Sequence, residues 1–307
     1  MIQYLYLGRV PYDEALRLQE ELVALRTAGR IANVLLLLEH PPVLTLGRNA
    51  RRSNILASNA LLAARGVTIH EINRGGDVTY HGPGQLIGYP IFDLRSLHSP
   101  QASQPGHGNR LGPVDFVRLM EEALVRLCAE FGVSADRICG LTGVWCGLPS
   151  GSAEGSPKCE PRQQISSKTQ EPGGRKIAAI GIHVARGVTS HGFAFNVTTD
   201  LRDFALINPC GITDRPVTSL EMEIAREVAR VGADPKSLPS LESLAHSAAR
   251  QFGQVFNQPV EFVSSLAALR AQAVPAPDLP TPEFLTEDTP LQIPPDRNCH
   301  KNVTPVS

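Results

Sequence analysis

KIAAIGIHVARGVTSHGFAFNV, residues 176–197, is the stretch that decides the fold. Large apolar side chains recur at every second position in each half: Ile180, Ile182 and Val184, then Phe193, Phe195 and Val197. Alternation with this period is typical of a β-strand that buries one face. Arg186-Gly187 between the halves suits a tight turn, so the sequence predicts an antiparallel hairpin here.

Further strands and helices are predicted on both sides of the hairpin. Strands are expected at 31–39, 43–46, 67–72, 85–94 and 143–147, and helices at 11–28, 114–131, 219–231 and 241–256. Their order does not follow a regular strand–helix–strand alternation. It therefore favours an α+β fold, in which helices flank a mixed β-sheet.

Two segments differ in composition from the rest of the chain. Residues 149–174 are rich in Ser, Pro, Gly and Gln and have almost no large apolar side chain, so they predict a disordered insertion. Residues 274–307 contain eight prolines in 34 positions without periodicity, which predicts a flexible tail. We therefore expect one folded domain at 1–260, interrupted by the insertion and followed by the tail.

Charge and apolar patterning exclude several classes of protein. There are 29 basic and 30 acidic residues, giving a formal net charge of −1, so no general attraction to nucleic acid or to an anionic membrane is expected. The longest apolar run, 34–38, is far too short to span a bilayer, and the N-terminus lacks signal-peptide features. The six cysteines include no CxxC pair, so no metal site is expected. A cytoplasmic protein is predicted.

The segment RGGDVTYHGPGQLIGYP, residues 74–90, contains five glycines. It lacks the Lys-Ser/Thr of a phosphate-binding loop, and its glycines precede a predicted strand instead of a helix, so no nucleotide cofactor is expected. The glycines allow a ligand to approach the main chain closely, beside the polar groups of Tyr80 and His81. The alternative is a pair of tight turns with a structural histidine.

Two single residues are candidates for chemistry. Cys210 lies between a proline and a glycine in INPCGI, residues 207–212, which leaves its sulfur sterically open. A nucleophilic cysteine needs a nearby cation or helix N-terminus to stabilise its thiolate. Lys176 opens an apolar strand that is flanked on its other side by the diglycine at 173–174, and its ammonium could lie over a pocket there. On these patterns alone, a buried structural cysteine and a solvated lysine remain the alternatives.

Together with GVW at 143–145, these segments resemble the octanoyltransferases of lipoate biosynthesis, the lipoyl(octanoyl) transferase family. The resemblance covers most of residues 1–225. It implies the catalytic fold of the biotin and lipoate protein ligases, a mixed sheet flanked by helices, with no cofactor.

The resemblance also implies a ping-pong acyl transfer without ATP, the first step of endogenous lipoate biosynthesis. Cys210 would take an octanoyl group from octanoyl-acyl carrier protein as a thioester. A lysine of a lipoyl domain, in a 2-oxoacid dehydrogenase or in the glycine cleavage H protein, would then accept it. Lys176 would lower the pKa of Cys210 and shuttle protons. The implied substrate-binding residues are Arg74, Gly75, Gly76, Asp77, Val78, Thr79, Tyr80, His81, Ala179, Ile180, Gly181, Gly192, Phe193 and Ala194.

Three other activities are compatible with this fold. An ATP-dependent lipoate or biotin ligase needs no cysteine nucleophile and tends to carry three consecutive glycines where this chain has YHGPGQ. A non-catalytic carrier-binding module would not need the cysteine and lysine. A thioesterase would use water as the acceptor. A basic rim formed by Arg48, Arg51, Arg52 and Arg74 is a further hypothesis, for docking acidic carrier proteins.

Overall fold

The computed structural model describes residues 1–98, 110–148, 174–208, 215–232 and 238–274. The predicted insertion at 149–174, except for its last residue, and the predicted tail, except for its first, lie outside these ranges. The folded unit extends beyond the predicted boundary at 260, because a strand at Val260–Phe262 and a helix at Leu266–Ala271 still belong to it.

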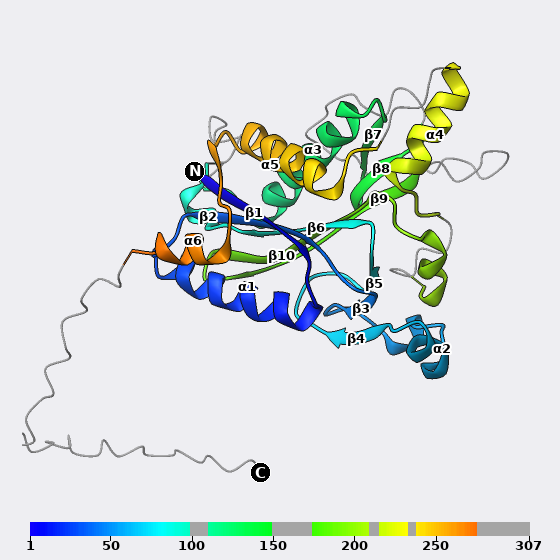
Figure 1. Cartoon of the computed structure of the whole chain (residues 1–307), viewed down its shortest axis with the longest axis horizontal. Coiled ribbons are helices and arrows are strands. Elements are labelled where there is room, and N and C mark those ends of the chain that lie inside the picture. Colours follow the sequence, from blue (N-terminus) through cyan, green and yellow to red (C-terminus); the bar gives the residue numbers. More distant parts are fainter. Residues whose placement is uncertain (99–109, 149–173, 209–214, 233–237, 275–307) are drawn as a thin grey trace, which may run out of the picture. The chain divides into compact units, whose positions relative to one another are not determined.

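Eight strands of the described residues form one large sheet, in the order β11-β1-β2-β6-β10-β9-β8-β7 (Figure 1). Their bounds are β1 Ile2–Arg9, β2 Asn33–Glu39, β6 Gln85–Ile91, β7 Ala135–Ile138, β8 Leu141–Cys146, β9 Arg175–Ala185, β10 Val188–Asn196 and β11 Val260–Phe262. β1 runs parallel to both of its neighbours, β11 and β2, whereas the other pairs are antiparallel. The predicted mixed sheet is therefore confirmed.

A small second sheet has the order β4-β3-β5. Its strands are β3 Val43–Leu46, β4 Thr68–Glu71 and β5 Val78–His81, with β3 parallel to β4 and antiparallel to β5. β5 is part of the glycine-rich segment, for which the sequence indicated only close main-chain approach or tight turns. Its four residues, placed between glycines, are too short to show a strand pattern.

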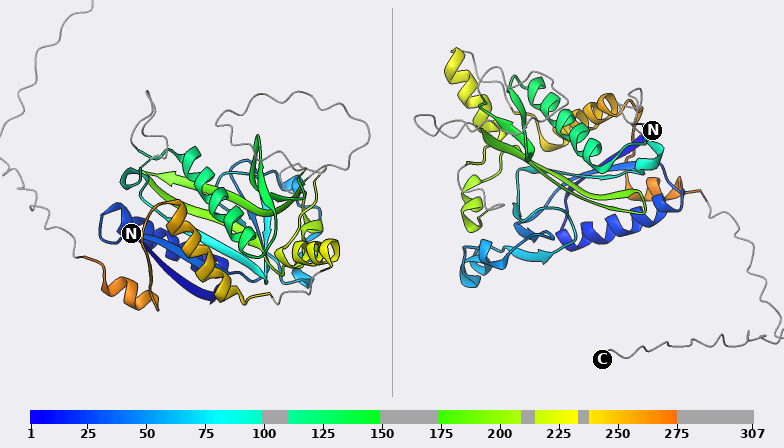
Figure 2. Two further views of the ribbon diagram at one scale, coloured as in Figure 1. Left: turned by 90° about the horizontal axis from the view of Figure 1, so that it is seen from above. Right: turned by 180° about the vertical axis from the view of Figure 1, so that it is seen from behind.

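Helices cover both faces of the large sheet (Figures 1 and 2). The helices are α1 Tyr12–Thr27, α2 Asn59–Ala64, α3 Pro113–Glu130, α4 Leu220–Val231, α5 Leu241–Val255 and α6 Leu266–Ala271, with short 3-10 turns η1 Arg52–Asn54, η2 Leu94–Ser96 and η3 Leu201–Leu206. α3 and α5 lie on one face and α1 on the other. None of the helices in the described part of the chain has the length and apolar character that a bilayer crossing requires.

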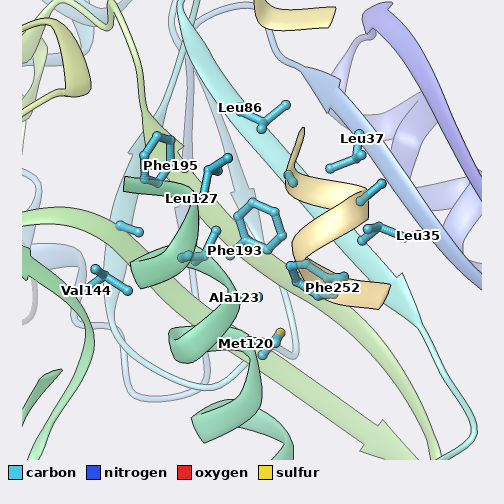
Figure 3. Packing of buried hydrophobic residues seen from close by; sticks show 14 of the residues in the cluster. Leu35, Leu37, Leu86, Met120, Ala123, Leu127, Val144, Phe193, Phe195 and Phe252 are labelled. Atoms are coloured by element: carbon cyan, nitrogen blue, oxygen red, sulfur yellow. The ribbon is translucent and has the colours of Figure 1, made fainter. Parts of the chain in front are cut away.

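The apolar core is divided by the sheet. On the α3 and α5 face, Leu35 and Leu37 of β2 pack with Phe193, Met120 and Phe252 (Figure 3). On the α1 face, the intervening β2 residues pack in a second cluster with helix residues such as Leu18 and Leu22. Both faces of β2 are thus buried, which explains why its sequence is a continuous apolar run and does not alternate.

The predicted hairpin is confirmed as β9 and β10, paired from Ala185 opposite Val188 down to Ala178 opposite Phe195. Arg186 and Gly187 form its turn with φ values of 52° and 82°. Two consecutive residues with positive φ match the twist of an antiparallel pair, and so this two-residue turn joins the strands without splaying them. The hairpin places Lys176 and the residues near Gly192 on one continuous surface.

Candidate active site

A cavity of about 400 Å³ lies against β6, β9 and β10 of the large sheet, beneath the loop at 74–77 and strand β5. It is lined by Lys176 and by every predicted substrate-binding residue except Tyr80: Arg74, Gly75, Gly76, Asp77, Val78, Thr79, His81, Ala179, Ile180, Gly181, Gly192, Phe193 and Ala194. The 74–81 segment and the β9–β10 hairpin, which are about 100 residues apart in the sequence, therefore meet at one cavity. Their role as substrate contacts stays a prediction.

The Tyr80 side chain lies on the opposite side of β5 from the cavity. Its ring is 1% exposed and packs edge-on against Phe204, while its hydroxyl donates a hydrogen bond to Asp203 Oδ2 at 2.7 Å. Its neighbours in the chain, Thr79 and His81, line the cavity, whereas the Tyr80 ring and hydroxyl are taken up by Phe204 and Asp203. The prediction that Tyr80 is a polar contact near the reacting centre does not agree with this geometry.

Several cavity residues were not predicted from the sequence. They are Tyr12 of α1, Ile87 and Tyr89 of β6, Val117 of α3, Gly140, Leu141, Thr142, Ile182 and His191. Ile87 and Tyr89 belong to the quoted glycine-rich segment, and their period-two spacing was an available signal. α1 and α3 reach the cavity only through tertiary packing, so no local pattern identifies Tyr12 or Val117.

Glycines bring the cavity walls close together. A Cβ atom on Gly192 would lie 2.0 Å from the Gly88 carbonyl oxygen, and one on Gly181 would lie 2.7 Å from the Gly75 carbonyl oxygen. The amide of Gly75 also donates to the Ile182 carbonyl at 2.9 Å. Bare main chain at these positions therefore lets the 74–77 loop lie directly on β9.

The Arg74 guanidinium is buried in the cavity wall. Arg74 is 8% exposed, and its Nη2 donates to the Thr45 carbonyl at 2.7 Å and to Thr45 Oγ1 at 3.0 Å, while its Nη1 donates to the Gly75 carbonyl at 3.0 Å. It is therefore not part of a surface rim, in contrast to the hypothesis from charge clustering. Arg48, Arg51 and Arg52 are exposed, and Arg52 forms an ion pair with Glu71.

Lys176 lies directly opposite Trp145 in the pairing of β9 with β8. Its Nζ is 4.6 Å from the centroid of the Trp145 ring, and the guanidinium carbon of Arg215 is 5.7 Å from the same centroid. An ammonium over an indole face is stabilised in its charged form. The GVW motif thus has a physical role, because Trp145, 1% exposed, provides the surface on which the Lys176 ammonium lies.

The segment that follows the predicted nucleophile is attached to β9. The Lys176 amide donates to the Pro216 carbonyl and the Thr218 amide donates to the Lys176 carbonyl, both at 2.9 Å. Cys210 itself lies outside the described residues, which stop at 208 and resume at 215. On the preceding side, the Asn208 amide donates to the Asn54 carbonyl at 2.7 Å.

Three buried histidines are uncharged at neutral pH: His81 and His191 line the cavity, and the His40 ring lies 6.1 Å from that of His81. The pKa of His81 is lowered to about 3, and the pKa values of His40 and His191 are lowered to about 4, mainly because the three side chains are buried. The charge of Arg74 also contributes to the low pKa of His81 and of His191. His191 has a φ of 56°, which is uncommon for a residue other than glycine. Its Nε2 lies 2.7 Å from Asn73 Oδ1. His183 of β9 is half-buried and does not line the cavity.

These histidines make stability dependent on pH. In the unfolded chain they take up protons as the pH falls below about 6.5, whereas in the folded protein they stay neutral until about pH 4 or below. The unfolded state therefore binds more protons in this window, and the free energy of unfolding falls as the pH falls, by about 1.4 kcal/mol per pH unit for each histidine. Urea unfolding at a series of pH values measures this slope.

His191→Asn provides the comparison for that measurement. Asparagine tolerates positive φ, so the backbone at this position is retained while one titrating group is removed. The free energy of unfolding of the variant is expected to depend less steeply on pH between about 6.5 and about 4. Equal slopes for the two proteins would contradict the assignment of a buried neutral imidazole.

The chain is similar to a known domain family and to curated proteins. A model of the lipoyl protein ligase A/B catalytic domain matches residues 11–231. An octanoyltransferase of Acidobacterium capsulatum is 55% identical over 265 residues, which cover 86% of this chain and 94% of that protein. An octanoyltransferase of Koribacter versatilis is 45% identical over 290 residues, 94% of each chain.

Solved structures show the same fold at low sequence identity. A bi-partite lipoate protein ligase of Thermoplasma acidophilum superimposes with a TM-score of 0.57 at 15% identity, covering 89% of this chain and 90% of that one. A lipoate-protein ligase A bound with ATP gives 0.56 at 13% identity, covering 89% and 92%. At such identities the likeness concerns the fold alone. With 55% identity to a curated relative over most of its length, the chain belongs to the octanoyltransferase family, which shares the lipoyl protein ligase A/B catalytic domain.

Proposed function

We propose that this protein transfers an octanoyl group from octanoyl-acyl carrier protein to a lysine of a lipoyl domain, through a thioester on Cys210 and without ATP. The observation that carries the proposal is the position of Lys176. It lines a cavity whose walls include the small or apolar residues Ala179, Ile180 and Ala194. Its amide donates a hydrogen bond to the carbonyl of Pro216, six residues after Cys210 in the sequence. A cation beside a thiol favours the thiolate, which is the nucleophilic form.

In the first half-reaction, the Cys210 thiolate attacks the carbonyl carbon of the donor thioester. A new carbon–sulfur bond forms, the bond to the phosphopantetheine sulfur breaks, and the released thiolate takes a proton from the Lys176 ammonium. In the second half-reaction, the neutral ε-amine of the acceptor lysine attacks the acyl-enzyme. An amide forms, the Cys210 thiolate leaves, and Lys176 takes up the proton that the amine loses.

The cavity walls suit an uncharged acyl chain. Ala179, Ile180 and Ala194 offer small or apolar surfaces, and the neighbouring histidines carry no charge at neutral pH. The buried Arg74 guanidinium is oriented by main-chain carbonyls and by Thr45. Octanoyl-acyl carrier protein as donor, and lipoyl domains of 2-oxoacid dehydrogenases or the glycine cleavage H protein as acceptors, are the partners that this chemistry requires.

An ATP-dependent ligase is the main competing activity on this fold. Such an enzyme needs a site for the phosphates of ATP, commonly built from glycines at a helix N-terminus. In this chain the glycines at 82–84 lead directly into strand β6, so no helix N-terminus follows them. The glycines at 82–84 therefore do not form a phosphate site of that kind, and the requirement for ATP is decided by experiment.

A two-stage incubation without ATP tests the proposal. The protein is first mixed with octanoyl-acyl carrier protein, and its intact mass is expected to increase by one octanoyl group that hydroxylamine removes. Addition of a lipoyl domain is then expected to move the octanoyl group onto that domain as a hydroxylamine-stable amide. A strict requirement for ATP would exclude this mechanism, and free octanoate as the sole product would indicate a thioesterase.

A further inference from the structure

A continuous row of buried hydrogen bonds connects the glycine-rich cavity wall to the strand of Lys176. Its links are Arg74 Nη2 to Thr45 Oγ1 (3.0 Å), Thr45 Oγ1 to His81 Nε2 (3.3 Å), His81 Nδ1 to Gln85 Oε1 (2.8 Å), Gln85 Nε2 to Asn196 Oδ1 (2.9 Å), Asn196 Nδ2 to the Thr218 carbonyl (2.9 Å) and the Thr218 amide to the Lys176 carbonyl (2.9 Å). Apart from Lys176, each of these residues is at most 8% exposed. The row therefore runs through the interior, away from competing water.

The two ends of the row determine the direction of every bond between them. The Thr218 carbonyl can only accept, so Asn196 presents its NH₂ group there and its oxygen to Gln85. Gln85 must then donate to Asn196, and it also donates to the Tyr80 carbonyl at 3.3 Å, which requires the same amide orientation. The remaining Gln85 oxygen accepts from Nδ1 of His81.

The Arg74 end of the row leads to the same arrangement of protons. A guanidinium can only donate, so Thr45 Oγ1 accepts from Arg74 and directs its own proton to Nε2 of His81. His81 is therefore held as the neutral tautomer with its proton on Nδ1, and Nε2 acts as acceptor. Two independent constraints, a carbonyl at one end and a cation at the other, lead to a single proton arrangement.

The surroundings of His81 oppose an added proton. Its charged or titratable neighbours are Arg74 from the preceding loop, His40 after β2, His191 of β10 and Tyr12 of α1. Burial is the largest cause that lowers the pKa of His81, and the nearby histidines and Arg74 add to it, whereas the bond to Gln85 acts in the opposite direction. An imidazolium here would place two buried cations close together.

We propose that Gln85 and Asn196 are positioning residues. They hold His81 as the Nδ1–H tautomer, and they keep the cavity wall formed by residues 74–81 at a constant position relative to residues 216–218, which pair with Lys176. This inference rests on the proposed octanoyl transfer, because the groups held in register are the acyl-cavity wall and the proposed proton shuttle. Neither side chain lines the cavity. Gln85 acts through its hydrogen bond to His81. Asn196 acts through its hydrogen bond to Thr218, whose amide donates to the Lys176 carbonyl.

The position of these residues explains which kinetic constant they should control. The row ends on residues 216–218, which pair with Lys176 and follow the segment of Cys210 in the sequence. Displacement of the residues in this row of hydrogen bonds would change the distance between a bound acyl carbonyl and the reacting groups. Small displacements of this kind lower kcat strongly. A carrier protein is far larger than the cavity of about 400 Å³, so its contacts would lie outside this row and its KM should change little.

Nitrogen NMR of the wild-type protein tests the tautomer directly. In protein labelled with ¹⁵N-histidine, the ring signals of His81, assigned by their loss in His81→Gln, are expected to show a protonated Nδ1 and an unprotonated Nε2 from about pH 8 to about pH 6. An Nε2–H tautomer, or an imidazolium in this range, would overturn the inference. This measurement requires no catalysis, so it decides the tautomer even if octanoyl transfer is not observed.

The substitution Gln85→Glu tests the positioning role. A carboxylate can accept from His81 but cannot donate to Asn196 or to the Tyr80 carbonyl, and its charge favours protonation of His81. We expect kcat for acyl-enzyme formation to fall about tenfold, with KM within about twofold of wild type. We also expect a further loss from about pH 8 to about pH 6 that wild type does not show, because His81 titrates in the variant.

Gln254→Glu is the matched control. Gln254 is exposed on α5, away from the cavity, and the substitution introduces the same charge. It should show the wild-type kcat and pH profile. A Gln85→Glu variant that folds and also retains the wild-type kcat and pH profile would refute the positioning role, while absence of acyl-enzyme in the wild type would instead refute the proposed function. If Gln85→Glu does not fold, the tautomer measured in wild type still decides whether the row exists.

Discussion

Cys210→Ser is expected to abolish the hydroxylamine-labile octanoyl adduct. A cysteine has a measurable thiolate fraction at neutral pH and is intrinsically nucleophilic, whereas a serine hydroxyl without a strong base stays protonated. Lys176 can stabilise a thiolate near its ammonium, but it cannot ionise a hydroxyl to a comparable extent. Intact-mass analysis after incubation with octanoyl-acyl carrier protein measures the adduct, and transfer to a lipoyl domain is expected to be lost with it.

The control for this substitution is Cys299→Ser, since that cysteine belongs to none of the motifs described above. It should form the adduct at the wild-type rate. Thermal unfolding of both variants checks that the serine at 210 has not simply prevented folding. A normal adduct on Cys210→Ser, mapped to another residue by peptide mass analysis, would disprove the assignment of the nucleophile.

Lys176→Met is expected to slow acyl-enzyme formation by a factor of about 10² to 10⁴, the usual contribution of a positioned acid–base group. Methionine keeps an unbranched apolar side chain against Trp145 but removes both the charge and the transferable proton. The thiolate of Cys210 then loses its nearby cation, and the leaving phosphopantetheine thiolate loses its proton donor. Rapid-mixing experiments with mass detection follow the rate of acylation, and the melting temperature should stay close to that of wild type.

Lys176→Arg separates the two roles of this residue. An arginine keeps a cation near the Trp145 ring, but it does not lose its proton at accessible pH. Thiolate stabilisation should therefore be partly kept, and acylation should be faster than in Lys176→Met. Transfer to the lipoyl lysine needs a group that takes up a proton, so this step should remain slow. Equal acylation rates of the two variants would contradict stabilisation of the thiolate by the Lys176 charge.

Most of the regular elements were predictable because their patterns are local. The 43–46 strand, the β9–β10 hairpin and the long helices each have a period or a turn that neighbouring residues alone impose. Strands β1, β5, β7 and β11, and the short helices α2 and α6, were not predicted. The three-residue β11, for instance, is a strand only because β1 provides its hydrogen-bond partners.

The same division holds within the candidate site. The motifs identified Lys176 and thirteen substrate-binding residues that line the cavity, because each motif is a short run whose chemistry is visible in its composition, but nine further lining residues belong to no predicted site. The face that a side chain occupies was not visible, since Tyr80 and His81 are adjacent in the sequence yet lie on opposite sides of β5. The burial of Arg74 could not be predicted either, because Thr45, which accepts from its guanidinium, is 29 residues away in the sequence.

The sequence by itself determined the family, the mixed sheet and the segments that meet at the site, because these depend on local periodicity and on motifs that can be read directly. Tertiary structure alone decided which groups are paired and which are charged. Trp145 lies beside Lys176 through strand register. His81 is neutral because burial and Arg74 disfavour its protonation, and its proton is placed on Nδ1 by a row of bonds from Arg74 to Thr218. Burial and hydrogen-bond direction arise only when residues distant in the chain come into contact.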